Sequence, residues 1–111
     1  MNIFSEKEED FYIISIEGDL DASSCIILDK AIAEAVAKGE NKILVNCINL
    51  NYISSAGLGV FMSYIQEFEN NNIGLVLFNV SSKVKNVFQI LGLDELIKIV
   101  ADKEEARNLL K

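Results

Sequence analysis

The middle of the chain changes from a polar segment to a regular apolar pattern. After Asn51–Ser55, apolar side chains recur at every third or fourth position, which is the spacing of one face of an amphipathic helix. The pattern predicts a helix that begins at Ser54 or Ser55 and ends near Glu69, followed by a turn of three asparagines. The residues on the predicted apolar face are Leu58, Phe61, Met62, Ile65 and Phe68.

Other apolar runs predict the strands of a sheet. Residues 11–17 alternate between two faces with a period of two, and Gly18 ends this run. The runs at 43–48 and 73–78 are almost continuously apolar, which is typical of strands covered on both faces in a parallel sheet. The remaining expectations are short strands from Ile3 and over 96–100, a charged turn over 6–10, and a connection over 49–54 into the central helix.

Capping residues and glycines mark three further helices. The first is capped by Asp21 or Ser23, and Gly39 suits the position just after its end. The second of these helices is expected to start at Ser81 or Ser82 and to end before Gly92. The third is expected to start at Asp102, which together with Glu105 resembles a capping box. In the first helix the residues expected to face inward are Cys25, Leu28, Ala31, Ile32, Ala35 and Val36. In the second they are Val84, Val87, Phe88 and Leu91, and in the third Ala106, Leu109 and Leu110.

Strands and helices alternate along the chain, so the sequence predicts an α/β fold with right-handed crossovers. The expected architecture is a mixed, mostly parallel sheet of four to five strands with about four helices. The chain has 111 residues, which fits a single domain over 1–111, and half of them are hydrophobic, enough for one core.

The charge and hydropathy of the chain limit its partners and its location. The net charge of −7 argues against nucleic acid or an anionic membrane as the main partner. No apolar run approaches the ~20 residues of a membrane-spanning helix, and the acidic N-terminus lacks the pattern of a secretion signal. The sequence therefore predicts a cytoplasmic protein.

The chain lacks the residue types of most catalytic and metal sites. It has no histidine, which removes the usual general base for a serine nucleophile, and its two cysteines, Cys25 and Cys47, are far apart in sequence. The segment S-S-A-G-L-G is not a nucleophile elbow, because Ile53 occupies the first glycine position, and its G-L-G is not a nucleotide-binding loop. We expect no enzyme activity, no metal and no cofactor, and we expect the cysteines to be reduced, small hydrophobic side chains.

The two serines before the central helix allow two interpretations. Either one could simply cap the helix, since a serine hydroxyl accepts a hydrogen bond from a free N–H of the first turn. Alternatively, one hydroxyl is an exposed phosphate acceptor, because a helix N-terminus carries free N–H groups and a partial positive charge that tolerate a dianion. Asp19 and Asp21 allow two interpretations as well, as turn and capping residues or as functional ones.

Three short motifs, G-D-L-D at 18–21, S-S-A-G-L-G-V at 54–60 and L-G-L-D at 91–94, follow one another along the chain. In this order and spacing they resemble the STAS-domain family, and most closely its single-domain bacterial anti-sigma factor antagonists. The corresponding family motifs are G-E-L-D, D-S-S-G-L-G-V or D-S-A-G-L-G, and G-L-D. The resemblance covers nearly the whole chain, although Ser54 and Asn46 stand where many members carry aspartate.

This resemblance implies an anti-sigma factor antagonist in a partner-switching pathway. In the family, the unphosphorylated antagonist binds an anti-sigma factor that is also a serine kinase of the histidine-kinase-like ATPase type. Phosphorylation by that kinase releases the antagonist, and a serine phosphatase resets it. The phosphorylated serine of the family corresponds to Ser55. The alternative is a non-phosphorylated structural STAS subunit of a transport or larger signalling complex.

We expect the partner to bind where the first long strand ends and the central helix begins, because these two points should share one rim of the sheet. The outward side of the central helix would extend this surface. The residues expected to contact the partner are Asp19, Asp21, Ser54, Ser55, Ala56, Gly57, Leu58, Gly59, Val60, Ser63 and Tyr64, with Glu67 as a further candidate.

Overall fold

A five-stranded sheet forms the centre of the molecule, and the computed structural model describes all residues, 1–111. The strands lie across the sheet in chain order; β1 is antiparallel to β2, and the other neighbours are parallel. The α/β fold with a mixed, mostly parallel sheet is therefore confirmed. The strands are β1 (Asn2–Glu8), β2 (Phe11–Leu20), β3 (Lys42–Ile53), β4 (Gly74–Phe78) and β5 (Lys98–Val100).

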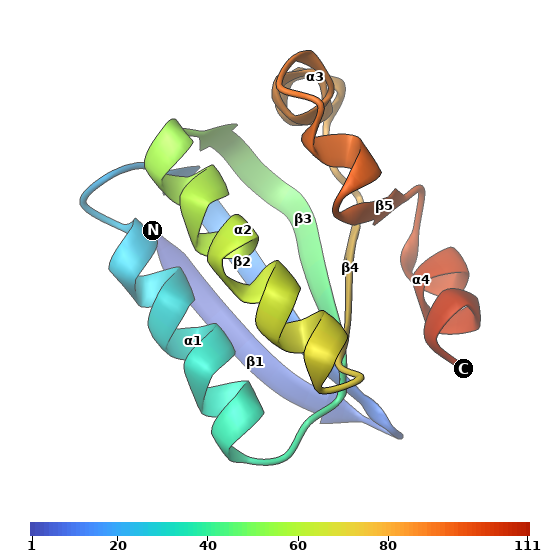
Figure 1. The fold of residues 1–111 in the computed structure, drawn as a ribbon. Coiled ribbons are helices and arrows are strands. Elements are labelled where there is room, and N and C mark those ends of the chain that lie inside the picture. Colours follow the sequence, from blue (N-terminus) through green and yellow to red (C-terminus); the bar gives the residue numbers. More distant parts are fainter.

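Helices cover the two faces of the sheet unequally. Helices α1 and α2 lie side by side over one face, which we call the inner face, while α3 and α4 lie toward the β4–β5 edge (Figure 1). The helices are α1 (Cys25–Ala37), α2 (Ser55–Asn70), α3 (Ser82–Ile90) and α4 (Lys103–Leu110), with a short 3-10 turn, η1, at Leu93–Glu95. None of these helices combines the length and the apolar character needed to span a membrane.

Three strands extend beyond their predicted ends, whereas β4 begins at Gly74 instead of residue 73 and β5 begins at Lys98 instead of residue 96. The expected turn over 6–10 is wrong, because β1 continues to Glu8 and only Glu9 and Asp10 form the turn. Strand β2 continues past Gly18, and β3 includes residues 49–53 instead of leaving the sheet. Pairing between neighbouring strands holds these polar segments extended, with register shifts between β2 and β3, where β3 carries the extra residues, that a local pattern does not reveal.

Two apolar clusters fill the spaces on the two faces. The inner cluster packs α1 and α2 onto β2, β3 and β4, and the rings of Phe61 and Phe88 meet in it at 6.4 Å between centroids. The smaller outer cluster lies under α4 and contains Phe11, Ile13, Leu44, Val76, Phe78 and Ala106. Hence α4 is the only helix that contributes a buried side chain to the outer face.

The helix predictions are confirmed except at a few ends. Leu28, Ile32 and Ala35 of α1 are buried as expected, and glycines with positive φ follow α1 (Gly39, 81°) and α3 (Gly92, 70°). Two inward residues were predicted wrongly, since Leu91 is 55 % exposed and Leu109 is 46 % exposed. Leu91 already lies beyond the last turn of α3, and in the short helix α4 it is the neighbouring Leu110 that packs on the sheet.

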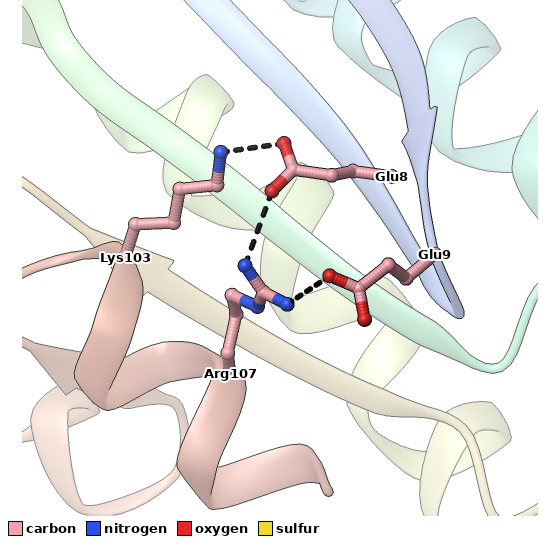
Figure 2. A network of polar contacts seen from close by, with 4 residues as sticks. All are labelled: Glu8, Glu9, Lys103 and Arg107. Carbon is pink, nitrogen blue, oxygen red and sulfur yellow. Dashed lines mark hydrogen bonds and ion pairs between the residues drawn. The ribbon is translucent and has the colours of Figure 1, made fainter.

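Helix α4 is tied to the turn between β1 and β2 by a network of charges (Figure 2). The Nζ atom of Lys103 lies 2.6 Å from Oε2 of Glu8, and Nη1 of Arg107 lies 3.2 Å from Oε1 of the same carboxylate. Arg107 also pairs with Glu9 and lies over the Phe11 ring, 5.3 Å from its centroid. The network joins the two ends of the chain across the outer cluster.

We predict that Glu8→Gln makes stability less sensitive to acid. The hydrogen bond from Lys103, with the charges of Lys103 and Arg107, holds the pKa of Glu8 below its ordinary value. A carboxylate whose pKa is lower in the folded chain adds stability above its unfolded pKa and loses it as the pH falls through the folded pKa. Urea titrations from about pH 6 to about pH 3 should therefore show a smaller loss of unfolding free energy for Glu8→Gln than for the wild type.

The control for this experiment is Glu6→Gln, on the same strand but outside the network. High salt should reduce the difference between Glu8→Gln and the wild type, because these ion pairs are partly exposed. Identical pH profiles for Glu8→Gln and the wild type would contradict the role given to the network.

Candidate functional site

The carboxyl ends of β2 and β3 lie next to each other and hold the predicted site together. Leu20 pairs with Ile53, and the N–H of Ser54 donates to the Leu20 carbonyl at 2.9 Å. The loop after β2 therefore touches the start of α2, as the shared rim predicts. We call this region the serine rim and define it as Asp19–Asp21 with Ser54–Gly59.

The two serines of the rim have different surroundings. Ser54 is the residue before the first turn of α2, and its Oγ accepts a hydrogen bond from the N–H of Gly57 at 3.2 Å. Ser55 is the first residue of the helix; its side chain is exposed, and no hydrogen bond ties its hydroxyl to the rest of the chain. The cap and the free hydroxyl are thus two different residues, so both interpretations of the serine pair can hold at once.

The two glycines of the rim differ in the room that each leaves for a side chain. A Cβ atom on Gly57 would lie 2.7 Å from Cγ of Leu20 and 3.1 Å from Cγ1 of Ile53, both of which are buried. A Cβ atom on Gly59 would meet nothing within 4 Å. Gly57 therefore lets the first turn of α2 rest directly on the strand ends, while Gly59 leaves backbone open at the surface.

The loop between β2 and α1 is organised by the carboxylate of Asp21. Its Oδ1 accepts the N–H groups of Ser23 and Ser24, each at 3.0 Å, and the Ser23 hydroxyl at 2.7 Å. These bonds, led by those from the Ser23 and Ser24 hydroxyls, lower the pKa of Asp21. Asp19, by contrast, is exposed. Asp21 thus shapes the loop, while Asp19 is the carboxylate available to a partner.

The predicted cap of α1 was only partly right. The helix begins at Cys25, preceded by Ser24, whose side chain makes no capping bond. Asp21 instead caps the turn before the helix, and its backbone carbonyl accepts the N–H of Cys25 at 2.9 Å. The prediction placed the acid in the right loop but assigned it to the wrong turn, because Asp21, Ser23 and Ser24 are all capping residue types and the sequence does not distinguish among them.

Comparison with known proteins now assigns the chain to a family. The family model of the STAS domain matches residues 2–106. The chain belongs to the STAS-domain family. Among curated relatives of this STAS domain, the anti-sigma-B factor antagonist of Staphylococcus epidermidis is 28 % identical over 99 residues, which cover 89 % of this chain and 92 % of that protein.

Solved structures share the fold of this STAS domain. An anti-sigma factor antagonist from Mycobacterium paratuberculosis superimposes with a TM-score of 0.90 at 16 % identity, covering 98 % of this chain and 92 % of that one. The Bacillus cell fate determinant SpoIIAA in its phosphorylated form superimposes with a TM-score of 0.73 at 25 % identity, covering 99 % of this chain and all of that one.

The outward side of α2 in this STAS domain offers fewer free side chains than the sequence suggested. Leu58 is buried with 3 % exposure, so its side chain belongs to the core instead of the surface. The hydroxyl of Tyr64 donates to Oδ1 of Asp29 at 2.7 Å, and burial together with this carboxylate raises the pKa of Tyr64. Tyr64 therefore links α2 to α1, which leaves Ser63 and Glu67 as the exposed candidates farther along the helix.

One residue of the rim region was missed by the sequence analysis. Tyr52 pairs with Asp19 across β3 and β2, and its side chain is 46 % exposed. It was overlooked because residues 49–54 were expected to leave the sheet, and a residue in a connection has no predictable face. A large exposed aromatic next to the serine rim is well suited to contact a partner.

The cysteines and acidic residues form no cluster that could hold a metal ion. Cys47 is fully buried, and burial raises its pKa to about 12, while Cys25 is half-buried and not bonded to another cysteine. No group of three or more cysteine, aspartate or glutamate side chains is arranged to hold a metal ion. The serine rim is therefore the candidate functional site of the chain.

We predict opposite stability changes for alanine at the two glycines. Gly57→Ala should destabilise the protein by roughly 1–3 kcal/mol, because the new methyl group overlaps Leu20 and Ile53 in a packed core. Gly59→Ala should stabilise it by up to about 1 kcal/mol, because alanine favours the helix and nothing obstructs the methyl group. Urea denaturation of both variants measures the two changes, and equal effects would contradict the assignment of separate roles.

Proposed function

We propose that this STAS domain is an anti-sigma factor antagonist in a partner-switching pathway. In its unphosphorylated form it binds an anti-sigma factor that is also a serine kinase of the histidine-kinase-like ATPase type. The observation that carries the proposal is the exposed, unbonded hydroxyl of Ser55 at the start of α2, beside the capping residue Ser54. Relatives named anti-sigma-B factor antagonists support it.

Ser55 is the proposed phosphorylation site. A phosphate there would add about −1.5 to −2 charges at the helix N-terminus, where free N–H groups and the helix dipole stabilise an anion, so the fold should persist. SpoIIAA, a structural relative, has been solved in phosphorylated and unphosphorylated forms. Phosphorylation of Ser54 would instead remove the cap of α2, since its oxygen already accepts from Gly57.

The same phosphate would end the complex with the kinase. A partner seated on the serine rim would have to enclose a bulky, hydrated anion, and burying an anion without a well-placed cation costs several kcal/mol. A loss of about 1.4 kcal/mol already weakens affinity about tenfold. A serine phosphatase would then restore the binding form.

In this proposal the chain is a substrate and a binding module, acting in the cytoplasm as a single STAS domain. The proposed partner surface consists of Asp19, Tyr52 and the exposed part of the serine rim, with Ser63 farther along α2. Gly59 belongs to it because its open backbone allows a partner to approach closely. Asp21, Gly57, Leu58 and Tyr64 shape this surface from below or beside it.

The decisive experiment is incubation with ATP and a histidine-kinase-like ATPase from the same organism that binds the wild-type protein, followed by mass spectrometry. We expect phosphate on Ser55, and Ser55→Ala should bind the kinase but stay bound when ATP is added. Ser55→Asp should fold but bind weakly, because the partner would have to bury a hydrated carboxylate, which carries part of the charge of phosphate.

The matched control is Ser54→Ala. It should lower stability by about 1 kcal/mol through loss of the cap and yet still be phosphorylated on Ser55 and released by ATP. Phosphate on Ser54 with Ser55 unmodified would refute the assignment. No phosphate on either serine, with a complex insensitive to ATP, would favour a structural STAS subunit instead.

A further inference from the structure

The outer face of the sheet is only half covered. Helix α4 packs over the end of this face near the β1–β2 turn, where it covers the outer cluster. Toward the serine rim, no helix contributes a buried side chain to this side of β1 and β2. Phe4 pairs with Ser15 and Ser15 with Asn46, so these three residues form a row across β1, β2 and β3 on the outer face.

Two large apolar side chains in this uncovered area are exposed to solvent instead of being buried in a core. Phe4 is 55 % exposed and Ile48 is 63 % exposed. They border a depression of about 320 Å³. We call the area the outer patch and define it by the residues Phe4, Glu6, Ser15, Glu17, Asn46 and Ile48.

The outer patch carries charge of only one sign. Glu6 and Glu17 line the depression, and no lysine or arginine does. Lys7 directly follows Glu6 in sequence, but its side chain lies on the opposite face of β1, where it pairs with Glu40. A second copy of this acidic chain would bring carboxylates against carboxylates, whereas a segment with lysine or arginine beside apolar side chains would complement both features.

The outer patch is continuous with the serine rim. Glu17 pairs with Asn49 and Asp19 pairs with Tyr52, so each step along β2 and β3 leads from the patch toward Ser54. Register shifts interrupt the ladder between Ser15 and Glu17 and again between Gly18 and Asp19. Such irregularities re-aim side chains at sheet surfaces.

We infer that the outer patch is a second docking area for the protein that binds the serine rim, and that it receives a basic, apolar segment of that partner. The inference rests on the proposed function, because it takes the anti-sigma factor kinase as the partner. A standard interface buries about 800 Å² on each side, more than one loop and one helix turn provide. Phe4 and Ile48 would be buried against apolar side chains of the partner, and the carboxylates of Glu6 and Glu17 would favour a positively charged segment.

The test is calorimetric titration of the kinase, identified by binding to the wild type, with two matched double variants. Phe4→Ala with Ile48→Ala should weaken affinity about tenfold or more. Leu96→Ala with Leu109→Ala removes two leucines of similar exposure, 57 % and 46 %, from the other end of the molecule and should bind as the wild type does. Glu6→Gln with Glu17→Gln should reduce the salt dependence of the association rate.

The possible results separate this inference from the proposed function. If no such kinase binds or phosphorylates the wild type, both fail. If the wild type binds and Ser55→Asp binds weakly, but the Phe4 and Ile48 variant binds like the wild type, the second docking area is refuted and the proposed function stands. Sedimentation that finds a wild-type dimer dissociated by the same variant would assign the patch to a second copy and overturn the inference.

Discussion

The contact between the first turn of α2 and the ends of β2 and β3 is the constraint on which the serine rim depends. Gly57 has no side chain, so the helix rests against Leu20 and Ile53, and the N–H of Ser54 reaches the Leu20 carbonyl at 2.9 Å. The ends of β2 and β3 and the first turn of α2 therefore pack together at one place. This packing fixes the position of Ser55, whose exposed hydroxyl makes no hydrogen bond of its own.

The rim separates residues that support the surface from residues that form it. Within six residues, Ser54 caps, Gly57 packs and Leu58 fills the core, while Ser55 and Gly59 remain exposed. The loop after β2 repeats this division, because Asp21 is bonded to Ser23 and Ser24 and Asp19 is exposed. A surface built in this way changes little when its exposed member is modified, since every supporting bond belongs to a neighbour.

Local signals were sufficient to predict the starts of three helices and the closeness of the β2 end to the start of α2, but not the extent of the strands. Helix starts at Ser54, Ser81 and Asp102 were predictable because a capping side chain bonds its own turn. Strand residues 49–53 were missed because their partners in β2 are some 30 residues away in the chain and include register shifts. The roles of Gly57 and Gly59 could not be separated for the same reason, since only the position of Leu20 distinguishes them.

The charge already present on the rim bears on how a phosphate would act there. Asp19 is exposed, and the lowered pKa of Asp21 keeps that carboxylate ionised, so a partner that binds this rim benefits from basic groups of its own. Basic groups placed for these two aspartates are not thereby placed for a phosphate on Ser55, so the partner would still have to bury that anion without a well-placed cation. Release therefore has to come from the volume and hydration of the phosphate in a space that the partner fills. On this argument bulk contributes beside charge, so Ser55→Gln, which adds volume without charge, should also weaken binding to the kinase in a calorimetric titration.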